Sequence, residues 1–426
     1  MSPTRSARLY APVPSSGRAE LWERLRELHG AVAPVELEPG VPAWLLLGYH
    51  ENLSVLQNPH LFSRDTRQWR EVADGRVDLA ASRPALSWRP NALYADGPEH
   101  TRLRAPVADG LAQVDLAATA RTVRRIADDL IDAFTTTGRA DLIGDFAAPL
   151  PVLVLNHLYG LPDSYGHMLG DLTAVLFEAD ARRGEAAVAR VHQYFAGLVS
   201  RKRDRPGADL VSWMMAHPSR LSDHELSHAA ALINNASHQP TTHLIGNTLR
   251  TLLTDARIRT AHSDARLPVQ DLLDHVMWTD TPFQVLPARI ALQDVRVGNC
   301  DIRCGDALLI GFEAAHLDPA VRSAGGGRSH LMFGAGPHAC PARNLARTIA
   351  ATAVTAVHER LGGLRLDVAP RELRLTSSPF LRGLAELPVA FTPGEPVLPV
   401  AGPPEPRVEE HSDLLSRLLN WWRRGA

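Results

Sequence analysis

The sequence predicts a mainly helical fold with a small β region, in one large domain followed by a short tail. Three observations support this fold class. Residues 115–255 carry apolar side chains at helical spacing with few breaks, whereas residues 41–48 read as a strand. An alanine-rich helical run begins shortly after Cys340. No change in composition divides the first 392 residues, which argues for one domain rather than several.

Composition excludes several classes of protein. The net charge is −2 and the pI is near 6.8, so no nucleic acid partner is expected. Three cysteines are too few for a disulfide framework and suit a reducing compartment. No run approaches the ~20 apolar residues that span a bilayer, and the N-terminus lacks the apolar core of a signal peptide. We therefore expect a cytoplasmic location.

Along the chain, the predicted strand at 41–48 leads into a short helix at 49–58. Residues 67–95 have weak periodicity, and a long loop of this kind in a compact domain is usually functional or mobile. Ser222 and Glu225 form a capping box, which predicts the start of a long helix that reaches Asp255.

Cys340 lies in a loop that contains Gly334, Gly336 and Pro337, directly ahead of a predicted helix. A cysteine at this place has two readings: a small buried hydrophobic residue, or a thiolate favoured by the helix dipole and its unpaired N–H groups. Cys300 and Cys304 flank a predicted hairpin and have no further ligands nearby, so we do not expect them to bind metal.

The segment Phe333–Cys340 resembles the haem-thiolate signature of the cytochrome P450 superfamily, which decides between the two readings. The resemblance covers roughly residues 30–392. It implies the cytochrome P450 fold and haem b (iron protoporphyrin IX), with Cys340 as axial thiolate and Phe333 over the ring. The chain departs from the motif at Ala342, where the family usually has glycine.

His100 and Arg104 are four residues apart, so a helix presents both on one face. From the residues alone, this pair reads as a solvated basic face. The resemblance implies instead that both hold a haem propionate, for which a cation and a donor are suited. By the same resemblance, Arg289, His330 and His338 are expected to contact propionates.

The long helix departs from the family where an acid followed by threonine usually relays protons to bound dioxygen. By alignment, Gln239 stands at the acid and Pro240 at the threonine. An amide does not exchange a proton as a carboxylate does, and proline has no hydroxyl. Proline also removes one helical hydrogen bond, that to the carbonyl of Ala236. Thr241 takes the relay role if a kink shifts the register.

A second departure lies at the position of the family's paired glutamate and arginine, where this chain has His275 and Trp278. The segment 320–329, which would receive that pair, is also short and rich in glycine. The charged pair and the segment that receives it belong to one network of interactions, so their joint loss argues against a chance misalignment. We expect packing of Trp278 to hold this region.

Residues 393–408 are rich in proline and read as a stiff linker, and residues 409–426 read as an amphipathic helix. The apolar face of this helix is larger than a soluble monomer usually leaves exposed. It therefore docks on its own domain, on a protein partner or second copy, or on a membrane; the residues leave these alternatives open.

The resemblance implies an oxidative enzyme, a monooxygenase that acts on a small organic substrate with O2 and with electrons from a ferredoxin or similar partner. Proposed relay residues are Gln239, Pro240 and Thr241. The alternative is a haem-binding partner or sensor protein with little monooxygenase activity, which the two departures favour.

Overall fold

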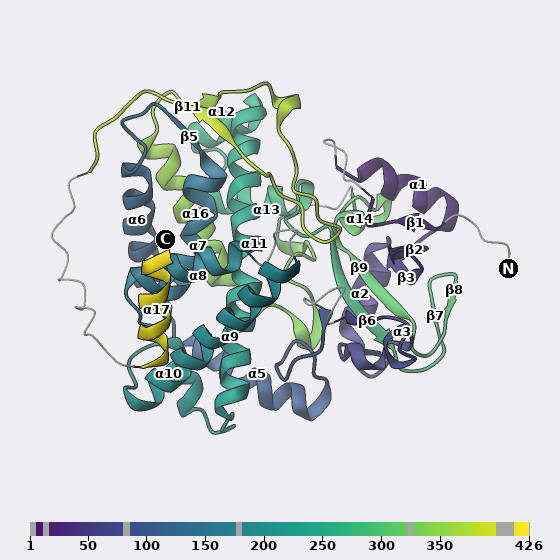
Figure 1. Cartoon of the computed structure of the whole chain (residues 1–426). Helices are drawn as coiled ribbons and strands as arrows, with labels where there is room; N and C mark the ends of the chain where they lie inside the picture. The colour runs from purple at the N-terminus through teal and green to yellow at the C-terminus, as the bar shows by residue number, and fades with distance from the viewer. Residues whose placement is uncertain are drawn as a thin grey trace. The chain divides into compact units, whose positions relative to one another are not determined.

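The computed structural model describes residues 6–11, 17–79, 86–175, 181–322, 327–397 and 413–425. The chain forms two compact units, and the helices dominate the second (Figure 1). The first unit comprises Met1–His100, His243–Arg343 and Val368–Leu387. The second comprises Thr101–Thr242, Asn344–Asp367 and Pro388–Ala426.

The first unit is built on a six-stranded sheet with the order β1-β2-β3-β9-β6-β4. Its strands are β1 (Ala7–Arg8), β2 (Val32–Glu38), β3 (Val41–Leu46), β4 (Phe62–Ser63), β6 (Val285–Ala291) and β9 (Ala307–Gly311). The pairs β1–β2 and β3–β9 are parallel and the others antiparallel. A separate hairpin joins β7 (Val295–Val297) to β8 (Cys300–Ile302), as the sequence predicts. The strand and short helix expected at 41–58 are likewise present.

The helices of this unit are α1 (Ala19–His29), α2 (Tyr49–Gln57), α3 (Arg70–Ala73), α12 (Ala256–Ser263), α13 (Val269–Thr279), α14 (Phe312–His316) and α15 (Pro319–Arg322). The core contains Trp22 and Trp69, both fully buried. Trp69 anchors the beginning of the loop expected at 67–95, whose residues 80–85 lie outside the described part.

The second unit is a set of packed helices: α6 (Leu116–Asp132), α7 (Pro149–Leu158), α8 (Asp163–Val175), α9 (Ala181–Asp204), α10 (Leu210–Ala216) and α17 (Leu414–Gly425). It also holds most of α5 (Gly97–Ala112), α16 (Arg343–Arg360) and α11 (Asp223–Thr254). A three-stranded antiparallel sheet has the order β10-β11-β5, with β5 at Arg139–Asp141, β10 at Arg365–Leu366 and β11 at Pro388–Ala390.

The capping box of α11 forms as predicted, because each partner satisfies the other at the helix start. The Ser222 N–H donates to the Glu225 carboxylate at 2.8 Å, and the Glu225 N–H donates to Ser222 Oγ at 3.2 Å. The helix then continues through Pro240 to Thr254 without a break. Proline therefore costs one hydrogen bond here and does not end the helix.

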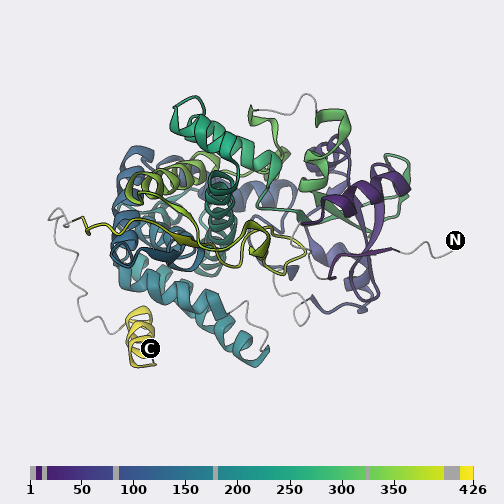
Figure 2. The same cartoon turned by 90° about the horizontal axis from the view of Figure 1, so that it is seen from above.

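The C-terminal helix α17 packs against α9 and α8 of its own unit (Figures 1 and 2). Leu415, Leu418 and Leu419 are buried at this contact. Arg201 of α9 donates to the carboxylate of Asp413, with its Nε 2.7 Å from Oδ2. The apolar face that the sequence indicates is therefore packed, at these three leucines, against helices of the same unit. Residues 398–412, most of the predicted linker, lie outside the described part.

Within the described residues, no helix has both the length and the apolar composition that a membrane span requires.

Candidate functional site

The Cys340 loop is folded tightly by its own backbone. Gly334 and Gly336 both have φ near +67°, which favours glycine. The Cys340 N–H donates to the Phe333 carbonyl at 2.8 Å and closes the loop. A β-carbon on Gly336 would stand 2.4 Å from the carbonyl oxygen of Leu56, so a side chain there would displace α2. The loop therefore holds one fixed shape in which Cys340 is half-buried.

Cys340 lies three residues before the start of α16 at Arg343, as the sequence predicts. The partial positive charge at a helix N-terminus favours a thiolate over a thiol. All three cysteines lie in the described part, and none forms a disulfide. The guanidinium of Arg343 lies over the Phe333 ring, 5.6 Å from its centroid, and so adds a cation to this loop.

His338, two residues before Cys340, lies against His100, with 4.1 Å between the ring centroids. Its Nε2 is 3.4 Å from Asp96 Oδ1. Burial lowers the pKa of His338 to about 3, against the opposing hydrogen bond with Asp96. Burial alone would raise the pKa of Asp96, but hydrogen bonds led by those of His338 and Ser63 outweigh it and lower that pKa to about 2. A neutral His338 therefore donates to an ionised Asp96.

Two buried guanidinium groups belong to the same cluster. Arg64 donates to the carbonyls of Pro287 and Ala288 at 2.7 and 3.0 Å, so backbone oxygens partner it. Arg289 is only 2% exposed, and its Nη1 is buried with no acceptor among the described residues. Burial, and then repulsion from Arg64, hold the pKa of Arg289 well below its ordinary value.

The cluster thus pairs two buried guanidinium groups with one carboxylate, that of Asp96. A buried guanidinium N–H without an acceptor is costly, and a carboxylate ligand would satisfy it. Haem carries two such carboxylates on its propionates. The donor set of Arg289, His100 and His338, beside a cysteine loop, fits this cofactor.

His330 has different neighbours from those three residues. Its Nε2 is 3.3 Å from the buried carboxylate of Asp274, and its ring lies among those of Trp278, His316 and Phe333. Arg104 lies one turn after His100 in α5, as predicted from their spacing.

Trp278 packs in the region where the sequence predicts that it replaces a charged pair. Its indole stacks on Tyr49 at 6.4 Å between centroids and lies beside His316 at 4.8 Å. Its Nε1 donates to the carbonyl of Gly327 at 3.0 Å, and Tyr49 Oη donates to that of Ser329 at 2.6 Å. Two aromatic side chains therefore hold the segment that follows the short glycine-rich stretch, of which residues 323–326 lie outside the described part.

The three proposed relay residues are consecutive in α11. Gln239 and Pro240 are half-buried and Thr241 is buried. The next hydroxyl along, Thr242 Oγ1, donates to the carbonyl of His238 at 3.1 Å and is thereby engaged within the helix. Thr241 carries the hydroxyl group nearest in sequence to Gln239 and Pro240, which stand where the family usually has an acid and a threonine.

Two members of the site could not be recognised from sequence. Arg64 follows β4 with no motif around it, and Asp96 reads only as the residue ahead of α5. The signal for Asp96 is weak, because an aspartate before a helix is usually a cap. Its role as a hydrogen-bond acceptor in this cluster depends on Ser63 and His338, which the fold brings beside it.

Comparison with known proteins identifies the family. The chain is 32% identical over 390 residues to the cytochrome P450 monooxygenase PikC of Streptomyces venezuelae, covering 88% of this chain and 91% of that protein. It is 30% identical to cytochrome P450 107B1 of Saccharopolyspora erythraea, covering 87% and 94% respectively. It is 29% identical to the vitamin D(3) 25-hydroxylase of Pseudonocardia autotrophica, over 83% and 89% of the two chains. No family model matches the chain.

Solved structures agree with the sequence relatives. CYP154C4 from Streptomyces sp. W2061 superposes with a TM-score of 0.81 at 26% identity and covers 91% of this chain and 98% of its own. Myxobacterial CYP267B1, solved with myristic acid, superposes with a TM-score of 0.80 at 28% identity, over 92% and 100% of the two chains.

The fold and the cysteine loop define a haem-thiolate protein. The chain belongs to the cytochrome P450 family. The predicted fold class is therefore confirmed, and the protein is an oxidoreductase of the monooxygenase type whose cofactor is haem with an axial cysteine thiolate.

Proposed function

We propose that Cys340 is the axial ligand and that Arg289, His100 and His338, with Arg104, hold the propionates of the haem. The observation that carries this proposal is the buried Nη1 of Arg289, which has no acceptor among the described residues although it lies near Asp96 and His338. When bound, the haem supplies the activation of dioxygen for insertion of oxygen into an organic substrate.

The residues around Cys340 have the separate task of keeping it a thiolate. The Phe333 carbonyl fixes the backbone of Cys340, the start of α16 lies three residues away, and Arg343 contributes a cation next to Phe333. His330 supports the loop ahead of Phe333 through Asp274.

The reaction requires electrons, which we propose come from a ferredoxin or similar protein in the cytoplasm of a bacterium. The substrate is a small organic molecule. PikC and the vitamin D(3) 25-hydroxylase, both bacterial, are named for reactions of this class.

Proton delivery is where this chain differs from an efficient monooxygenase. Neither Gln239 nor Pro240 can pass a proton, because one has an amide and the other no donor. Thr241 has the hydroxyl but no adjacent acid. We therefore infer that a large share of the electrons is lost to peroxide rather than spent on product.

A haem-binding partner or sensor with little turnover is the second candidate, and the Gln239–Pro240 pair favours it. One experiment separates the two. NAD(P)H consumption is measured with surrogate ferredoxin and reductase across a panel of compounds, and organic product is counted against peroxide. Product above the compound-free background supports a monooxygenase. Complete conversion of NAD(P)H into peroxide with every compound would reject it in favour of the sensor.

A further inference from the structure

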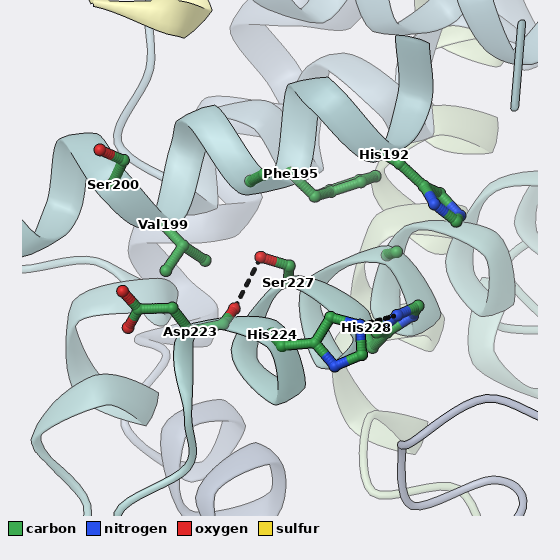
Figure 3. Close-up of a pocket in the computed structure, with 10 residues that line it drawn as sticks. His192, Phe195, Val199, Ser200, Asp223, His224, Ser227 and His228 are labelled. Atoms are coloured by element: carbon green, nitrogen blue, oxygen red, sulfur yellow. Dashed lines mark hydrogen bonds between the residues drawn. The ribbon is translucent and has the colours of Figure 1, made fainter. Parts of the chain in front are cut away.

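Three histidines line a pocket of about 270 Å³ between α9 and α11 in the second unit (Figure 3). His224 and His228 are one turn apart on α11, and His192 comes from α9. The remaining wall is mainly apolar and includes Phe195 and Val199. Nothing in the oxidative reaction described above uses these imidazoles.

His224 and His228 point toward each other within this pocket, as Figure 3 shows. Their Nε2 atoms are 3.2 Å apart, and the rings are nearly perpendicular, at 82° with 4.5 Å between centroids. Two metal–nitrogen bonds of about 2.0–2.1 Å that meet at an angle between about 90° (square) and about 109° (tetrahedral) place their nitrogens about 2.8–3.4 Å apart. The observed separation falls inside this range.

The spacing supports the same conclusion independently of the distance. Histidines at i and i+4 on one helix face can bind one metal ion together, since both imidazoles extend from successive turns. In the apo state one imidazole donates to the other, and a metal ion would replace that single hydrogen bond with two coordinate bonds.

The charges around the pair do not oppose a cation. Asp223 pairs with Arg203, and Glu225 pairs with Arg102, so these carboxylates and guanidinium groups compensate each other. No group of three or more histidine, cysteine, aspartate or glutamate side chains in the described ranges is arranged to hold a metal. The ring centroid of His192 lies 5.6 Å from that of His228, farther than the 4.5 Å between the centroids of His224 and His228, so the proposed pair does not include it.

We propose that His224 and His228 form a two-ligand site for a divalent transition metal ion such as Cu²⁺, Ni²⁺ or Zn²⁺. These ions prefer imidazole nitrogen, with Cu²⁺ bound most tightly. The other coordination positions hold water in the adjoining pocket. Because the ion bridges two turns of folded α11, it stabilises the beginning of that helix by linkage.

The test uses untagged holoprotein treated with a chelator and then titrated calorimetrically with CuCl2 or ZnCl2. His224→Gln and His228→Gln should each weaken the tightest site by at least about tenfold, since even changing a group that only orients a ligand costs about 10–100-fold. His192→Gln is the matched control and should bind as the parent does. Zn²⁺ should also slow amide hydrogen exchange in the first turns of α11 in the parent and not in His228→Gln.

The proposal is overturned if the parent binds Cu²⁺ no more tightly than His224→Gln. It is equally overturned if His192→Gln loses the site as fully as the two proposed ligands do. The haem spectrum of each variant, compared with that of the parent, establishes that the variant is folded.

Discussion

The contact between α17 and α9 can be broken at one residue of α9, without changing α17 itself. At Gly197 an added β-carbon would stand 3.1 Å from both the Cβ and the backbone nitrogen of Leu415. Gly197→Leu adds three further carbons, for which no room remains while Leu415 stays in place. Leu415 is fully buried, so exposing its side chain to water costs about 1.5–3 kcal/mol of the free energy that holds α17 in place. Leu419, also buried, leaves with it.

The expected result is that α17 undocks. Amide hydrogen exchange over residues 414–425, followed by mass spectrometry, should rise to the rate of an unprotected peptide in Gly197→Leu. Gly170→Ala in α8 is the control, because a β-carbon there meets nothing within 4 Å. That change should leave α17 protected and stabilise the protein by about 0.5–1 kcal/mol through helix propensity.

Protection of α17 in Gly197→Leu equal to that in the parent would refute this reasoning. It would mean that α17 is not held at Gly197, and that a partner, a second copy or a membrane covers its apolar face. Molecular mass in solution and binding to anionic liposomes, compared between the parent and a chain that ends at residue 406, would then identify the surface.

Three further predictions concern the site and its surroundings. Gln239→Glu combined with Pro240→Thr should raise the ratio of product to peroxide on the best substrate; tight coupling in the parent would contradict the relay argument. Burial lowers the pKa of His316 to about 3, so the unfolded state takes up a proton first and stability falls as pH drops below about 6.5. Each pH unit down to about 3 should cost up to about 1.4 kcal/mol through His316 alone. His316→Asn should reduce the slope by this share, because His338 is also buried with a lowered pKa and keeps its own, whereas His60→Asn, at an exposed histidine, should leave the slope unchanged. Trp278→Phe loses the hydrogen bond to a backbone carbonyl and should lower the free energy of unfolding by about 1 kcal/mol, and an unchanged value would contradict a supporting role.

Local features of the fold could be predicted because the residues that determine them are adjacent in sequence. The capping box of Ser222 and Glu225 forms reciprocally, and the hairpin that contains Cys300 pairs Val295 with Ile302. The glycines of the Cys340 loop form the tight turn that their spacing predicts, and both adopt positive φ there. In each case, geometry over a few residues decides the outcome.

The partners of buried polar groups could not be predicted, because they come from distant parts of the chain. Asp96 meets His338 across 242 positions, and Asp274 meets His330 across 56. The resemblance assigns His330 a contact with a haem propionate, and the structure adds a protein partner that the sequence does not indicate, the carboxylate of Asp274. Only the fold reveals such pairings, since propensity and periodicity carry no information on contacts at long range.

The central claim is that Cys340 provides a thiolate ligand to haem. The most direct measurement is the absorption spectrum of the reduced carbon monoxide complex of freshly folded protein. We predict the band of a thiolate-ligated haem, its loss in Cys340→Ala, and its retention in Cys304→Ala, where the cysteine is exposed. A band at the position of histidine-ligated or thiol-ligated haem in the parent protein would contradict the claim.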